Sequence, residues 1–223
     1  LSSSSAASDV YKRQVQGRCM SLFKQLTDKP WERKGILGGL NPEGAFESPP
    51  ERVALGFFLV IASVIFSLLG VSYVIRMSLP DWEPLADPAQ LWLNTGLLFI
   101  SSVLFQWARN TAKAGKQKNL ITAFIGGGVF ALLFIMGQML TWDSLQEAGY
   151  FVTSNPANSF FYLLTGLHIA HLLGGLWVWS KTSIRLLSGS KPEDVSLSIE
   201  LCTLYWHFLL IIWLVMFAIL SNT

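Results

Sequence analysis

Five long runs of apolar residues, separated by short charged stretches, dominate this sequence of 223 residues. Each run is close to the roughly 20 residues that a helix needs to cross the hydrocarbon core of a bilayer. A spanning segment must satisfy its own backbone hydrogen bonds, since lipid offers no partner, and an α-helix does so. We therefore predict an all-α fold, an integral membrane bundle of five transmembrane helices over residues 53–75, 91–108, 120–142, 160–180 and 201–220.

The composition agrees with a membrane protein and excludes two other classes. Only 13% of the residues are charged, against about 25% in an ordinary soluble domain. The net charge of +2 is small and scattered, so the chain lacks the basic face that a nucleic-acid partner requires. The two cysteines, Cys19 and Cys202, form neither a disulfide framework nor a metal motif.

The chain ahead of the first run divides into two parts. Residues 1–19 begin with a serine-rich stretch unlike the rest of the chain, and we interpret them as a non-native, adaptor-derived segment. Residues 20–52 open at a methionine and carry mixed charge, with glycines and prolines that prevent a long helix. We interpret them as a cytoplasmic N-terminal tail, followed by the five-helix transmembrane domain over residues 53–223.

Lysine and arginine mark one side of the predicted bundle. The N-terminal region and the stretches 109–118 and 181–197 hold 15 of the 16 basic residues. Loops rich in these residues stay in the cytoplasm. We therefore expect a multi-pass protein with a cytoplasmic N-terminus and a C-terminus on the periplasmic or extracellular side.

All three histidines lie inside predicted spans. His168 and His171 are three residues apart and share a helix face, while His207 lies in the last span. Polar side chains are costly in hydrocarbon, so we expect the histidines to form hydrogen bonds between helices. A metal site is disfavoured, because zinc takes four ligands, a di-iron centre needs carboxylates, and no span interior supplies Asp or Glu at that depth. A proton-transfer role and a bis-histidine haem held by His171 and His207 remain open.

Small and polar residues in the later spans predict contacts between helices. Gly166, Ala170 and Gly174 recur every four residues and predict close approach of a neighbouring helix, whereas Thr165 lies near the two histidines of the same span. The glycines at 126–128 and 137 predict close packing of the third span. Gln138 is expected to bridge to a neighbouring helix. Glu200, at the cytoplasmic mouth of the last span, is either a solvated charge at a helix end or a bridging, proton-supporting group.

Two long motifs resemble subunit III of cytochrome c oxidase, in the haem-copper oxidase family. Residues 158–175, NSFFYLLTGLHIAHLLGG, are similar to the family's FF..TG.H..H...G helix. Residues 200–217, ELCTLYWHFLLIIWLVMF, resemble its final helix. The similarity extends over about residues 53–220 and fits the shorter, five-helix bacterial form. The residues expected to carry the family motifs or the helix packing are Asn94, Thr95, Gln138, Thr165, Gly166, His168, Ala170, His171, Gly174, Glu200, Tyr205, Trp206, His207 and Trp213.

This resemblance implies an accessory subunit of a proton-translocating respiratory enzyme, with no catalytic, cofactor-binding or metal-binding residue of its own. Haem and copper would lie in the partner catalytic subunits. The chain would contact oxidase subunit I directly, share the complex with subunit II and carry bound phospholipid. In a bacterial plasma (inner) membrane it would support proton uptake and the stability of the catalytic subunit during aerobic electron transport.

The sequence also departs from the family and leaves rivals. Ser63, Thr141 and Leu210 stand where the family often carries carboxylates, so roles attached to those carboxylates are not transferred. The electron donor is open, because a quinol oxidase has a similar subunit. A bis-histidine cytochrome is the main rival. A small transporter would show inverted repeats or broken helices, and we find neither pattern.

Overall fold

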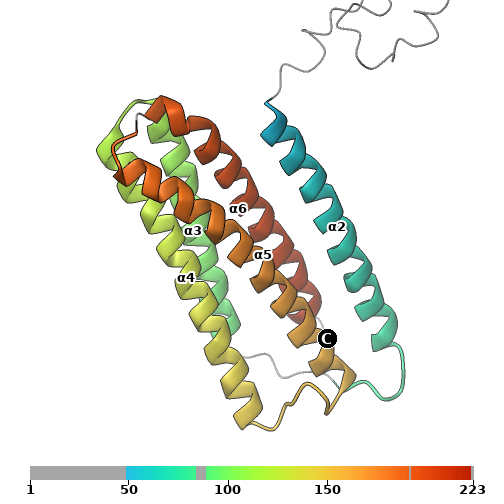
Figure 1. Cartoon of the computed structure of the whole chain (residues 1–223). Coiled ribbons are helices and arrows are strands. Elements are labelled where there is room, and N and C mark those ends of the chain that lie inside the picture. Colours follow the sequence, from blue (N-terminus) through green and yellow to red (C-terminus); the bar gives the residue numbers. More distant parts are fainter. Residues whose placement is uncertain (1–48, 84–88, 191, 222–223) are drawn as a thin grey trace, which may run out of the picture. The chain divides into compact units, whose positions relative to one another are not determined.

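The structure is a computed structural model that describes residues 49–83, 89–190 and 192–221. Over these residues the chain forms five helices and no strand (Figure 1). All five are long and apolar enough to cross a membrane, which confirms the predicted all-α membrane bundle. The interpretations of residues 1–19 and 20–48 fall outside the described residues. The helices are α2 (Pro50–Met77), α3 (Gln90–Lys113), α4 (Gln117–Glu147), α5 (Pro156–Leu187) and α6 (Pro192–Ser221).

Local signals explain where the helices start and stop. The Asn155 side chain accepts a hydrogen bond from the amide of Ala157 at 3.0 Å, with a proline at the first helical position of α5. The helices α3, α4 and α5 are followed by Gly115, Gly149 and Gly189, which have φ of 68°, 89° and 86°. Side chains with a Cβ avoid this left-handed region, so the glycines end the helices and turn the chain.

The helices α3, α4, α5 and α6 pack against one another, and α2 packs on α5 and α6 (Figure 1). Aromatic side chains fill the centre, where Trp206 stacks on Phe105 with ring centroids 5.0 Å apart. The helix α2 is the least enclosed. Only 17% of its most apolar stretch is buried, against 50% for α5 and for α6. The outer surface of α2 therefore has to be covered by lipid or by another protein.

The glycines of α4 allow neighbouring helices to approach, as predicted. A Cβ on Gly127 would lie 3.0 Å from the ring of Phe105 in α3. A Cβ on Gly137 would overlap the amide of Asn94, also in α3. The absence of side chains at these positions lets α3 and α4 pack closely along their length.

In the small-residue row of α5, Gly166 packs against another described helix as expected, whereas Ala170 and Gly174 face outward, contrary to our expectation. Ala170 and Gly174 are exposed, and a Cβ on Gly174 would meet nothing within 4 Å. Gly166 is half-buried, and a Cβ there would lie 3.6 Å from the ring of Trp142 in α4. The close contact involves Gly175 instead, where a Cβ would lie 2.7 Å from the ring of Tyr205 in α6. The rotation of α5 about its axis decides which small residues face inward, and residue spacing does not specify that rotation.

Candidate functional site

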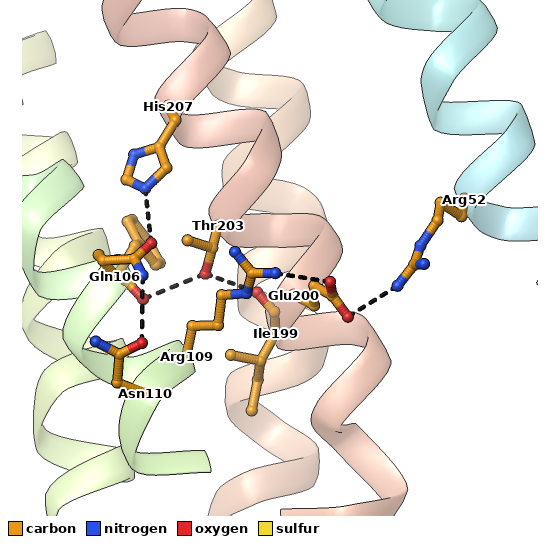
Figure 2. A network of polar contacts seen from close by, with 9 residues as sticks. Arg52, Gln106, Arg109, Asn110, Ile199, Glu200, Thr203 and His207 are labelled. Atoms are coloured by element: carbon orange, nitrogen blue, oxygen red, sulfur yellow. Dashed lines mark hydrogen bonds and ion pairs between the residues drawn. The ribbon is translucent and has the colours of Figure 1, made fainter. Parts of the chain in front are cut away.

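A carboxylate joins three helices at the end of the bundle where α2 and α6 begin and α3 ends (Figure 2). Glu200 of α6 accepts a hydrogen bond from Arg109 of α3 at 2.8 Å and from Arg52 of α2 at 2.9 Å. The three side chains keep 30–46% of their surface exposed, and such ion pairs contribute about 0–1 kcal/mol each. Their main effect is to position the helix ends. Of the two interpretations of Glu200, this geometry corresponds to the bridge between helices.

A separate chain of hydrogen bonds runs along α3 (Figure 2). His207 of α6 contacts Ser102 through Nδ1 at 2.5 Å and Gln106 Oε1 through Nε2 at 3.0 Å. Gln106 Nε2 in turn donates to Asn110 Oδ1 at 3.2 Å. One tautomer satisfies both bonds of the imidazole, with the Ser102 hydroxyl donating to Nδ1 and Nε2–H donating to Gln106. These bonds fix the orientation of the His207 ring between α6 and α3.

His168 is fully buried in an aromatic environment. Its ring centroid lies 5.2 Å from that of Trp213, 5.9 Å from Phe134 and 6.4 Å from Phe66. Neither ring nitrogen has a hydrogen-bond partner among the described residues. The prediction that this histidine forms a hydrogen bond between helices is therefore wrong. The physical reason is that the rings around it present carbon surfaces, while the Trp213 indole N–H donates to Thr95 instead.

His171 also differs from the expectation. Its Nδ1 bonds to the carbonyl of Leu167 in its own helix at 2.8 Å, and its ring packs on Phe58 and Phe66 of α2. Its ring thus faces α2, whereas His207 bonds to α3. The rings of His171 and His207, which a bis-histidine haem would require, therefore face different helices. Within the described residues no group of three His, Cys, Asp or Glu side chains is placed to hold a metal ion.

The remaining polar residues of the motifs connect helices in pairs. Asn94 of α3 donates to Gln138 at 3.2 Å and to Thr141 at 3.3 Å, both in α4. All three side chains are buried. Leaving such a group unpaired would cost about 1–3 kcal/mol, so these contacts hold α3 and α4 in one register. Gln138 thus forms a bridge from α4 to a neighbouring helix.

Two further hydrogen bonds join helices through an indole and a phenol group. Trp142 of α4 donates to Thr165 of α5 at 3.2 Å. The Tyr205 hydroxyl of α6 donates to the backbone carbonyl of His171 in α5 at 2.8 Å. Together with the contacts above, these bonds use most of the polar motif residues to join one helix to the next.

Glu200 and His207 have hydrogen-bond partners on α2 and α3 that were not predicted from the sequence. Arg52 and Arg109 were counted only as orientation signals, and Gln106 and Asn110 were not singled out. One signal was available, because Ser102, Gln106 and Asn110 recur every four residues and so share one face of a helix. Nothing in the spacing indicated that this face meets His207, about a hundred residues further along the chain.

Comparison with known proteins gives a consistent result. A family model described as cytochrome c oxidase subunit III matches residues 54–221. The protein named cytochrome c oxidase subunit 3 from a Synechocystis strain is 34% identical over 173 residues, which cover 73% of this chain and 71% of that protein. The protein of the same name from Glycine max is 29% identical to this chain, and the match covers 61% of this chain and 52% of that protein. The one from Loxodonta africana is 27% identical, with 75% and 68% covered. This chain thus spans about half the length of the Glycine max relative.

Proposed function

This chain belongs to the cytochrome c oxidase subunit III family, and we propose that it is the non-catalytic subunit III of a haem-copper terminal oxidase in a bacterial plasma (inner) membrane. The observation that carries the proposal is the family match, which takes in all five helices. The geometry supports an accessory role, since Glu200, His207 and Asn94 each join helices of the bundle. The chain would stabilise the catalytic subunit and support its proton uptake.

The redox chemistry would belong to other subunits. We propose direct contact with the haem-bearing and copper-bearing subunit I, with subunit II in the same complex. We also propose bound phospholipid, supported by two apolar grooves between α2 and its neighbours. Acyl chains match such surfaces, since lipid tails are as apolar as the side chains themselves. The grooves have volumes of about 320 and 350 Å³; the first is lined by Phe66, Val71, Leu164 and Met216, the second by Leu55, Phe58, Val178 and Tyr205.

Co-purification tests this function. A tagged form of the chain, extracted from its host membranes in mild detergent, is expected to carry with it a subunit with haem and copper. Deleting the chain should leave the haem spectrum of the oxidase intact, because the redox centres lie elsewhere, while activity decays over repeated turnovers. Assays with reduced cytochrome c and with quinol identify the donor. A tagged chain that brings no haem subunit, or that itself binds one bis-histidine haem, would contradict the proposal.

We also propose the orientation predicted from the basic residues, with the N-terminus cytoplasmic and the C-terminus periplasmic or extracellular. Arg76 is the one basic residue predicted to lie on the outer side. Its side chain donates a hydrogen bond to Asp81 at 2.6 Å, and this bond lowers the pKa of the Asp81 carboxyl. The pair therefore carries no net charge near neutral pH. The outer side then presents little positive charge to oppose its translocation.

Cysteine labelling in intact cells measures this orientation. In a variant with Cys19 and Cys202 replaced by alanine, we expect Val152→Cys to react with a membrane-impermeant maleimide. Ala114→Cys, in the turn between α3 and α4, should react only after the membrane is permeabilised. Both positions are exposed, so access depends on the side of the membrane. The reverse pattern would invert the orientation.

A further inference from the structure

The outer face formed by α3 and α6 carries polar groups where a lipid-facing surface should be apolar. A groove of about 420 Å³ opens on this face, and Gln106, Asn110 and His207 line it together with Val103 and Trp107. Gln106 and His207 are half-buried, and Asn110 is exposed. Polar side chains in a membrane span almost always face other helices or a water-filled cavity, because hydrocarbon cannot pair with them.

These groups have hydrogen-bonding capacity to spare. Gln106 Nε2 carries two hydrogens and uses one toward Asn110. The amide nitrogen of Asn110 makes no hydrogen bond to the described residues, whereas its oxygen accepts from Gln106. Three amide N–H bonds of this face, one on Gln106 and two on Asn110, are therefore without a partner among the described residues. A group that satisfies them must offer acceptor oxygens, from a carboxylate, carboxamide, hydroxyl or backbone carbonyl.

The depth of Gln106 favours a protein partner, and Asn110 lies one turn nearer the end of α3. Gln106 lies seven residues before the end of α3 at Lys113, about 10 Å along the axis at the helical rise. Apolar side chains border the donors on both helices, with Val103 54% and Ile211 59% exposed. A polar stripe between apolar borders is the composition of helix contacts in membranes, where interhelical hydrogen bonds supplement packing.

The amount of burial within this chain leads to the same conclusion. Among the five spans α3 has the lowest mean hydropathy, yet only 39% of its most apolar stretch is buried, against 50% for α5 and α6. The helix α2 is still more exposed, but most of its exposed residues are apolar, such as Phe57 and Ile61, and suit lipid. The least apolar span is thus less enclosed than α5 and α6, which are both more apolar.

We propose that the α3–α6 face, formed by Val103, Gln106, Asn110, His207 and Ile211, docks against a transmembrane helix of the haem-bearing subunit that presents a hydrogen-bond acceptor to Gln106 and Asn110. The identity of the partner rests on the proposed function; the choice of face rests on the geometry above. Glu200 and Arg109, at the cytoplasmic end of the same helices, hold α3 and α6 together and so keep the face in one shape.

Site-specific photo-cross-linking in native membranes tests the face. Benzoylphenylalanine at Val103 is expected to cross-link to the haem-bearing subunit, with a yield about tenfold above that from Ile61, which is 59% exposed on α2. If Ile61 cross-links to that subunit and Val103 reaches only lipid, another face docks; the inference is then wrong and the proposed function stands. If the purified complex lacks any haem-bearing subunit, the proposed function fails as well.

Amide substitutions test the hydrogen bonds themselves. Gln106→Ala combined with Asn110→Ala should reduce the amount of this chain retained by the oxidase after a detergent wash by about threefold or more, the size expected for lost interhelical hydrogen bonds. Gln146→Ala is the matched control. It also removes an exposed amide, but at the C-terminal end of α4 and away from the α3–α6 face. Equal retention of the double variant and the control would overturn the role assigned to the two amides.

Discussion

Replacing Trp213 by alanine is expected to lower the free energy of unfolding of the bundle by about 3 kcal/mol, at the low end of the range for removal of a buried tryptophan. The indole of Trp213 is 1% exposed. It packs against Phe134 and His168 with ring centroids at 4.9 and 5.2 Å, and its N–H donates to Thr95 at 2.9 Å. These three partners lie on α4, α5 and α3, so the substitution opens a cavity where four helices meet.

The expected value is at the low end because the reference state is also apolar. In a bilayer the substitution removes the packing of the indole against neighbouring atoms. The hydrophobic contribution is small, because the side chain is not exposed to water when the helices separate. Reversible unfolding in mixed micelles with increasing sodium dodecyl sulfate, followed by circular dichroism, measures the loss. Trp213→Phe retains most of the volume and should cost about 1 kcal/mol through the missing hydrogen bond.

Trp177→Ala is the control for this prediction. Trp177 lies on α5 and is 66% exposed, so lipid can fill the space that its side chain leaves. We expect a change below about 0.5 kcal/mol, as at most surface positions. Equal losses from Trp213→Ala and Trp177→Ala would show that the aromatic centre does not hold the four helices together.

Replacing Gly128 by alanine should destabilise the contact between α4 and α5. A methyl group at this position would overlap the indole of Trp179, whose N–H donates to the backbone carbonyl of Phe124 at 2.9 Å. The ring cannot move away without breaking that bond, so the helices must separate. Overpacking costs about 1–3 kcal/mol, and the higher helix propensity of alanine returns at most about 1 kcal/mol. We expect a net loss of roughly 1–2 kcal/mol.

The same detergent titration measures this loss, and Gly126→Ala is the control on the same helix. A Cβ on Gly126 would lie 3.4 Å from the end of the Leu104 side chain, an ordinary contact. Its helix propensity gain is the same as at Gly128, so the difference between the two variants isolates the clash with Trp179. A Gly128→Ala protein as stable as the Gly126→Ala protein would contradict the close packing of α4 on α5.

The number of spans followed from the apolar runs, but the helices extend beyond them. The run at 91–108 lies inside α3, which covers Gln90–Lys113, and the run at 160–180 lies inside α5, which covers Pro156–Leu187. Hydropathy marks the residues that lipid tolerates. A helix continues until its backbone meets a stop signal, such as the positive φ of Gly115 after α3 or the cap at Asn155 before α5.

The histidines show where prediction from the sequence ended. All three are polar residues inside apolar spans, and hydrogen bonds between helices were predicted for each of them. In the structure His207 bonds to two side chains of α3, His171 bonds to its own helix, and His168 has no partner among the described residues. The surroundings of each ring come from other helices, and the local sequence around a histidine does not contain them.

The sequence by itself determined how many helices cross the membrane, where the basic residues lie along the chain and which family the motifs resemble. Each of these properties belongs to single segments, because the bilayer sets a length and a polarity for every span separately. Only the tertiary structure decided that Gly175 faces α6 while Gly174 faces outward, and that His207 meets Ser102 across a separation of 105 residues. These outcomes depend on the rotation of each helix about its axis, which is set by packing against helices distant in the sequence.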